Sequence, residues 1–534
     1  MNIAVESWWM KPWSRKLWKF NFPVDKTQIN LFFLMKQSIK VGPIPRLAFI
    51  FCLLFALPAK AYLQFDQNCI QAYQKTWNLQ LGPAYGYLQA ERKLYPGNAL
   101  PALMDNYIAF LKVFTNEDID NYDTFKHACS KNIDILSKES GSRSPLYLFS
   151  IALIHFQSAL IRARFQDFWS ASFELKRAHS EFEENASKYP DFLLNYTYLQ
   201  IIETMLGNLP GNVKFFLSPL GLKGNVKEGL EKLEINLVQI KGGNFSFYYP
   251  EVALFYSFLC FSLAPERKTI QELKFITDPI PDKSLMKTYV MALMAIKKYQ
   301  NDLAIHCLLM KPKDPEYVQF HLLDYFLGMA YLNKLDTGCI RYFNNYIQYN
   351  KGNNFKKDAY LRISWAYTLM GKEDMAMKYL HHSLNTKLPN MTDRDKQAQR
   401  EAERGIQNRY LLKSRLLFDG GYFEEAAKIL NGVDSLGFSS FREKLEYTYR
   451  KGRIYELELK FPQALFYYKR TLDLGMNEPF YFAANASLHM GLIFEKMKKT
   501  SLAKQYFEQC LKMNEKEYKS SIDQEAQTGI NRLN

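Results

Sequence analysis

The sequence predicts an all-α protein, built as a solenoid of antiparallel helical hairpins. Long segments rich in Leu, Ala, Lys, Glu and Tyr are interrupted by only 25 Gly and 21 Pro in 534 residues, which favours helices over a loop-rich β-sandwich. A pattern of small residues recurs in the C-terminal half, and apolar residues recur at spacings of three and four in the N-terminal half. Because solenoids grow by stacking, a chain of this length does not require several separate domains.

Residues 1–61 are predicted to form a secretory signal peptide. Lys36, Lys40 and Arg46 precede an apolar run, Leu47–Leu57, and the small-x-small triplet 59–61 follows it, which is the three-part form of such a peptide. An apolar helix of this length spans roughly half of a bilayer core. No stable membrane span is therefore expected after cleavage, and a permanent anchor is the alternative.

The predicted signal begins late in the chain, so we expect translation to start at Met35 and residues 1–34 to be a gene-model extension. A long n-region is the alternative. Export would place the mature chain in the periplasm or elsewhere in the cell envelope.

The net charge and the cysteines exclude several classes of protein. The formal charge is +15, and leaving out the nine basic and two acidic residues of 1–61 reduces it to +8. After residue 61 no basic run with interleaved aromatic residues stands out, so nucleic acid is not an expected partner. Six cysteines remain after residue 61 and none has the C-x-x-C spacing of metal or redox sites. We expect them to be buried as small apolar residues.

A short pattern of small residues recurs in four C-terminal segments that align without gaps. Each has a small residue that precedes an Ala by twelve positions, with bulky residues three positions after the first and four after the second. Two antiparallel helices approach closely where side chains are small, and bulky neighbours fill the remaining space. The small pairs are Ser364 and Ala376, Ser414 and Ala426, Gly452 and Ala464, and Gly491 and Ala503; the bulky pairs are Tyr367 and Leu380, Leu417 and Leu430, Tyr455 and Tyr468, and Phe494 and Phe507.

At these positions the sequence resembles the tetratricopeptide repeat family, over roughly residues 320–515. The resemblance implies a right-handed superhelix of helical pairs that binds protein or peptide partners. A further segment matches through Gly328 and Tyr331 but has Ile340 where Ala is usual, and an earlier one fits through Ala292 and Ala304. The small residues are separated by 39 positions in one case and by 50 in another, against the family's 34, so inserted turns or long helices are expected.

We divide the mature chain into an irregular helical-hairpin region, 62–310, and a C-terminal repeat array, 311–534. A Gly- and Pro-rich stretch interrupts the first region between Leu206 and Leu233. The hairpin around residues 163–178 and the Gly-Asn-x-x-x-Gly-Leu motif at 224–230 resemble a eukaryotic family of tetratricopeptide proteins linked to clearing inclusion bodies and lipid droplets. That resemblance implies a helical repeat fold, and the signal peptide argues against the same cellular role.

Signatures of enzymes and cofactor sites are absent from the sequence. It contains no phosphate-binding loop, no G-x-G-x-x-G, no H-E-x-x-H and no G-x-S-x-G. The adjacent His381 and His382 are predicted to lie on a helix, where neighbouring side chains point about 100° apart and converge poorly on a metal. We expect no enzymatic activity, no cofactor and no metal.

In proteins that this chain resembles, the first helix of each pair lines a concave groove. By register, Trp365, Arg415, Tyr449 and Arg453 should face that groove, together with Leu492. Aromatic residues and Arg dominate protein-binding hot spots. Because a guanidinium group binds carboxylates through two parallel hydrogen bonds, we expect a partner that carries Asp, Glu or a free C-terminus.

Three functions fit these features. The favoured one is an exported, non-enzymatic scaffold that mediates protein–protein interactions in the cell envelope. The second is a structural subunit of an envelope or secretion assembly. The third is a hydrolase or glycan-binding protein on a helical scaffold.

Overall fold

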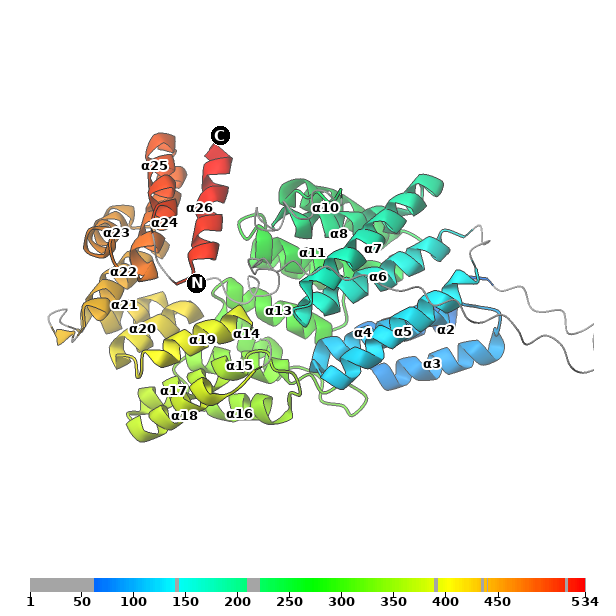
Figure 1. Ribbon diagram of the computed structural model, residues 1–534, viewed down its shortest axis with the longest axis horizontal. Helices are drawn as coiled ribbons and strands as arrows, with labels where there is room; N and C mark the ends of the chain where they lie inside the picture. Colours follow the sequence, from blue (N-terminus) through cyan, green and yellow to red (C-terminus); the bar gives the residue numbers. More distant parts are fainter. Residues whose placement is uncertain are drawn as a thin grey trace, which may run out of the picture.

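A computed structural model describes residues 62–139, 144–208, 221–388, 392–433, 437–438, 440–513 and 517–533. The predicted signal peptide lies outside these residues. The described part of the chain is helical, and its one isolated β-bridge joins Tyr62 and Asn98. The all-α hairpin architecture is therefore confirmed. The helices follow one another along an extended arc. The last helix, labelled α26 in Figure 1, stands between α24–α25 and the helices α10 and α11 from the middle of the sequence.

The N-terminal half contains hairpins and single helices whose faces meet in one core. Its elements are α2 (Gln67–Trp77), α3 (Leu81–Leu94), α4 (Pro101–Asn116), α5 (Ile119–Ser137), α6 (Leu146–Arg164), α7 (Phe168–Lys188), α8 (Leu193–Gly207), α10 (Val226–Gly242), η3 (Ser246–Tyr248), α11 (Tyr249–Leu263) and α12 (Ile270–Thr277).

The C-terminal half consists mostly of consecutive hairpins. Its elements are α13 (Leu285–Lys297), α14 (Asn301–Leu309), α15 (Leu322–Asn333), α16 (Cys339–Tyr349), α17 (Lys356–Met370), α18 (Glu373–Asn385), α19 (Asp393–Glu403), α20 (Arg409–Gly420), α21 (Phe423–Asn431), α22 (Phe441–Leu457), α23 (Phe461–Gly475), α24 (Tyr481–Lys496), α25 (Thr500–Leu511) and α26 (Lys519–Leu533).

The same turn closes eight of the described hairpins. One residue takes a left-handed backbone conformation, and the N–H of the next residue donates to the carbonyl five residues earlier over 2.8–3.0 Å. These two features define a Schellman motif, which satisfies carbonyl groups at the end of the first helix. The left-handed residues are Leu79, Gln166, Tyr299, Leu335, Gly371, Gly421, Leu459 and Lys498. The turn therefore repeats in both halves of the chain.

Glycine brings paired helices together at two of the predicted contacts. A Cβ added to Gly452 would lie 2.6 Å from the ring of Tyr468, and one added to Gly491 would lie 2.6 Å from the ring of Phe507. Both distances are shorter than any ordinary carbon–carbon contact. The ring of the second helix thus packs directly on the backbone of the first.

Serine takes the place of glycine in two other hairpins and adds a hydrogen bond. Ser364 Oγ donates to the carbonyl of Ala376 over 2.7 Å, and Ser414 Oγ donates to the carbonyl of Ala426 over 3.1 Å. These four residues, together with Ala464 and Ala503, are at most 1% exposed. A hydroxyl at these positions is satisfied by the facing helix, so burying it carries no penalty for a lost hydrogen bond.

The hairpin α15–α16 departs from the sequence alignment by one residue. A Cβ added to Gly328 would lie 3.0 Å from the ring of Phe343. The buried small residue on the second helix is Cys339, which is 0% exposed, whereas Ile340 is half-buried. The alignment of Ile340 with Ala is therefore wrong, because α16 packs on Gly328 through residues one position earlier in the sequence, Cys339 and Phe343.

The spacing of 50 residues between Ser364 and Ser414 has a structural explanation. Helix α19 is inserted between the hairpins α17–α18 and α20–α21. It is strongly polar in sequence, yet Asp395, Ala398 and Glu401 are buried. An added helix thus lies inside the repeat array.

Glycines at the end of the Gly-rich stretch allow α10 to pack closely on α8. A Cβ on Gly229 would lie 2.2 Å from the hydroxyl of Thr204, and one on Gly224 would lie 2.2 Å from the carbonyl of Glu203. The motif 224–230 therefore serves helix packing, with Asn225 accepting from the Glu228 N–H as the N-cap of α10.

The largest hydrophobic core extends from Leu63 to Leu416 without a break at residue 310. Two smaller cores occupy the C-terminal hairpins. Among the described helices, one, α6, is long and apolar enough to cross a membrane, but 78% of its apolar window is buried in the protein, as in core helices generally. The six described cysteines are free thiols, and all but Cys307 are buried.

Candidate partner-binding site

The four residues predicted to line the groove come from three first helices of the array. Trp365 lies on α17, Arg415 on α20, and Tyr449 and Arg453 on α22. They are 2%, 6%, 5% and 7% exposed, respectively. The expectation that these side chains face solvent is therefore wrong, and both guanidinium groups already have partners within the chain.

Arg415 binds a carboxylate of the same chain in the geometry expected for a partner. Its two terminal nitrogens donate to the two oxygens of Glu401 over 2.7 and 3.0 Å. The guanidinium plane lies 4.7 Å from the ring centre of Trp365, a cation–π contact. Tyr518 also donates its hydroxyl proton to Glu401 over 3.2 Å. Burial alone would raise the pKa of Glu401, but Arg415 holds it well below its usual range.

Arg453 is engaged in a second buried cluster, one hairpin further along. It lies 3.4 Å from Glu456 and also contacts His489, and its guanidinium lies 5.3 Å from the ring centre of Phe418. Burial lowers the pKa of His489, and Arg453 lowers it further. His489 and Arg453 in turn hold the pKa of Glu456 well below its usual range, against the effect of burial.

Tyr449 and Trp365 complete the wall of this surface. The hydroxyl of Tyr449 accepts a hydrogen bond from the Asn485 amide over 2.8 Å, and its ring packs against Tyr481 and Phe482. Trp365 is packed between Arg415 and Arg362, which lies 4.9 Å from the ring centre. Leu492 is half-buried.

Two segments that the repeat pattern does not include contact the residues predicted to line the groove. Helix α19 supplies Glu401, and the residues just before α26 supply Tyr518 and Glu517, which pairs with Arg404. Asp395 of α19 also accepts from the backbone N–H groups of Phe355 and Lys357 at the start of α17. The array thus binds carboxylates of its own helix α19 where a partner was expected.

A buried carboxyl in the N-terminal half was not anticipated from the sequence. Glu251 on α11 is 2% exposed and accepts from the hydroxyls of Tyr73, Tyr107 and Tyr198, over 2.5, 3.0 and 2.5 Å. Burial raises the pKa of Glu251 to about 7. The three rings come from α2, α4 and α8, so this network ties four helices together, and no sequence motif connects its members.

One described group has side chains that could hold a metal ion. Asp66, Cys69 and Glu91 offer ligand atoms that all lie within 4.8 Å of one another. No sequence motif predicts this group, because Cys69 and Glu91 lie on different helices and outside any metal-binding spacing.

Comparisons with known proteins identify the repeat. A family model described as the tetratricopeptide repeat matches residues 357–387 and 484–517. These ranges contain nearly all of the hairpin α17–α18 and most of the hairpin α24–α25. A comparison with curated proteins gave no match.

Solved structures with partial similarity include two natural proteins. One is the TPR domain of P58(IPK), at 11% identity and a TM-score of 0.21, covering 78% of this chain and 97% of that one. The other is the APC/C hetero-tetramer Cut9–Hcn1, at 12% identity and a TM-score of 0.22, covering 88% of this chain and 96% of that one. The family match covers two hairpins of the array, so the chain contains tetratricopeptide repeats.

Proposed function

We propose that this protein is an exported scaffold that holds other proteins in the cell envelope and catalyses no reaction. The single observation that carries the proposal is the array of tetratricopeptide hairpins. Stacked helical pairs present extended surfaces to protein partners, and this fold is typically non-catalytic. The pattern of Leu47–Leu57 and the small residues after it supports export.

The partner surface is not the pair of arginines first expected, because both are engaged inside the chain. Exposed aromatic side chains on other helices are better candidates. Phe275 on α12 and Phe466 on α23 are 73% and 61% exposed. Replacing either with Ser removes an apolar contact without disturbing a core, so the two substitutions are matched controls for each other.

Export is tested by the mass of the native protein. The mature chain should begin at Tyr62, and it should be recovered from the envelope without Leu47–Leu57. Replacing Ala59 and Ala61 with Arg should block cleavage and leave the precursor. A native product that retains the apolar run and stays anchored in the membrane would contradict this part of the proposal.

Partner binding is tested by cross-linking in native envelopes, followed by capture of the tagged chain. A scaffold should recover a defined protein set, and Phe275→Ser or Phe466→Ser should deplete one partner while the other variant retains it. Recovery in fixed stoichiometry with the same subunits would instead indicate a structural subunit of an assembly. Turnover of substrates in a hydrolase screen by the purified chain would refute the non-enzymatic assignment.

A further inference from the structure

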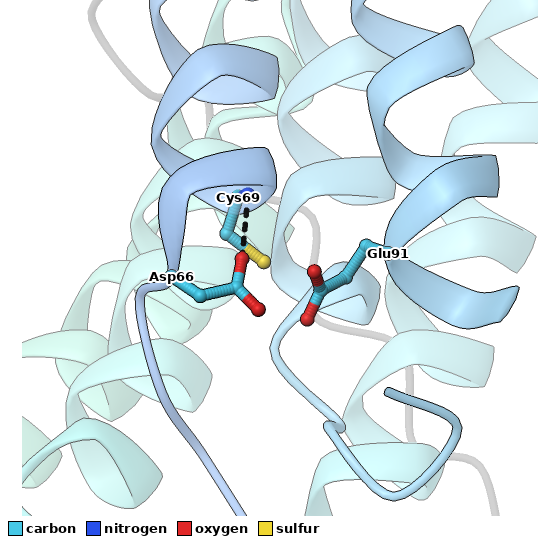
Figure 2. A group of neighbouring side chains, drawn as sticks. All are labelled: Asp66, Cys69 and Glu91. Carbon is cyan, nitrogen blue, oxygen red and sulfur yellow. Dashed lines mark hydrogen bonds between the residues drawn. The ribbon is translucent and has the colours of Figure 1, made fainter. Parts of the chain in front are cut away.

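Three metal-ligating side chains of the first hairpin face one another across a short gap. Asp66 precedes α2, Cys69 lies in its first turn, and Glu91 lies in the last turn of α3. The thiol and the two carboxylates converge between these helices (Figure 2). Asp66 accepts from the Cys69 N–H over 3.1 Å through one oxygen, so its second oxygen can bind a ligand at the same time.

The group concentrates negative charge in a buried place. Cys69 and Glu91 are 0% exposed. Within the described residues, neither Asp66 nor Glu91 forms an ion pair with a Lys, Arg or His. The buried carboxylates of the repeat array differ, since Glu401, for example, is paired with Arg415. A cation is the missing counter-charge of this arrangement.

Amide groups around the three side chains orient one of them. Asn98 donates to Glu91 Oε1 over 2.7 Å and to the carbonyl of Gln64 over 2.9 Å. Asn68 donates to Glu91 Oε2 over 3.3 Å. Carboxylates that bind metals are commonly held by such outer hydrogen bonds. Asp66 is half-buried, which leaves an entry path for an ion from solvent.

We propose that Asp66, Cys69 and Glu91 bind a zinc ion. A thiolate with two carboxylate oxygens suits Zn²⁺, which accepts both sulfur and oxygen ligands, better than it suits Mg²⁺ or Ca²⁺. With a Zn–S distance of about 2.3 Å and a Zn–O distance of about 2.1 Å, the ligand atoms of a tetrahedral site lie roughly 3.5 Å apart. The three ligand atoms here lie within 4.8 Å of one another, so small side-chain rotations bring them to this spacing. Three protein ligands leave the fourth position for water.

Zinc at this position would close the open end of the first hairpin. The ion joins the start of α2 to the end of α3, beside the bridge between Tyr62 and Asn98. Binding requires the Cys69 thiol to lose its proton. Metal affinity should therefore increase with pH.

The test uses the chain that starts at Tyr62, stripped with a chelator and titrated with Co²⁺ as a spectroscopic substitute for Zn²⁺. The expected result is one equivalent of Co²⁺ with a sulfur-to-cobalt charge-transfer band, displaced by Zn²⁺. Cys69→Ser should abolish the band, and Glu91→Gln should weaken affinity by at least about tenfold. Cys307→Ser removes a half-buried thiol elsewhere and should leave the band unchanged.

A second measurement on the unmodified chain covers the case in which Cys69→Ser does not fold. Bound Zn²⁺ should protect Cys69 from alkylation, as read by peptide mass, and should slow hydrogen exchange in α2 and α3. The proposal is overturned if the unmodified chain gives no sulfur-to-cobalt band. It is equally overturned if zinc leaves alkylation of Cys69 unchanged, and the three side chains are then a hydrogen-bonded carboxyl pair beside a thiol.

Discussion

Replacing Arg415 with Ala should be among the most destabilising changes of a charged residue in this chain. The substitution would leave the Glu401 carboxylate without its bidentate partner, in a place where its side chain is 5% exposed. It would also remove the guanidinium from the face of Trp365. The loss is therefore a buried charge without its counter-charge, and not a surface ion pair.

The magnitude follows from burial. Removing one partner of a buried ion pair costs about 3–5 kcal/mol, whereas an exposed pair contributes at most about 1 kcal/mol. The matched control at an exposed position is Arg341→Ala, since Arg341 lies on the surface of α16 over the ring of Tyr342. Replacing both Arg415 and Glu401 with Met should restore much of the loss, because neither charge then remains buried.

The pair should also make stability depend on pH. Arg415 holds the pKa of Glu401 well below its usual range. The stabilisation from the Arg415–Glu401 pair is therefore complete above the pKa of Glu401 in the unfolded chain, about 4.3, and is lost as pH falls through its pKa in the folded chain. The Met/Met variant should lose less stability than the natural chain below about pH 4.

The assay is denaturant unfolding together with hydrogen exchange in α19 and α20. Arg415→Ala should lower the unfolding midpoint and expose the amides of both helices, with Arg341→Ala close to the natural chain. Equal effects of the two substitutions would refute the burial of Arg415 and return it to the role of an exposed groove residue.

Three further outcomes follow from the packing and the turns. Gly452→Leu and Gly491→Leu should each cost about 1–3 kcal/mol by overpacking against Tyr468 and Phe507; unchanged denaturation midpoints for both would show that the repeat register is wrong. Gly371→Ala should cost about 1 kcal/mol, because its φ of +72° disfavours a Cβ, whereas Leu459→Gly, at φ +58°, should lose nothing in the same thermal unfolding assay. The pKa of the Glu251 carboxyl is raised to about 7 by burial, so its contribution to stability is complete below the pKa of the unfolded chain and is lost as pH rises through about 7. The free energy of unfolding should therefore fall by roughly 2–3 kcal/mol between pH 5 and 8, and Glu251→Gln should flatten this fall.

The repeats of the C-terminal half could be predicted because close helix contact restricts which residues are allowed. The ring of Tyr468 lies where any side chain on Gly452 would be, so the pattern must appear in the sequence. Ser could also be predicted at the Gly position, because it is small and its buried hydroxyl, as at Ser364, finds a hydrogen-bond acceptor on the facing helix. The shift to Cys339 could not be predicted, because a second helix that packs one residue earlier leaves the same residue types in the sequence.

The hairpin turns gave little sequence signal in either half, for a physical reason. Left-handed turn positions are recognised in a sequence by Gly, which adopts positive φ at no cost. Here the same turn is formed without Gly by Leu79 and Gln166 in the N-terminal half and by Leu335, Leu459 and Lys498 in the C-terminal half. Packing of the flanking helices enforces the backbone conformation, so the turn recurs while its sequence signature does not.

The groove residues show where repeat register stops being informative. Trp365 and Arg415 lie together, with the guanidinium 4.7 Å from the ring centre, and Arg415 binds a carboxylate of its own chain. The repeat register could not predict the position of α19, because an inserted helix belongs to no repeat. The carboxylate comes from Glu401 of that helix, so the preference for an acidic ligand is satisfied within the chain. A partner of this protein therefore has to bind elsewhere on its surface, or displace a helix whose Asp395 also caps α17.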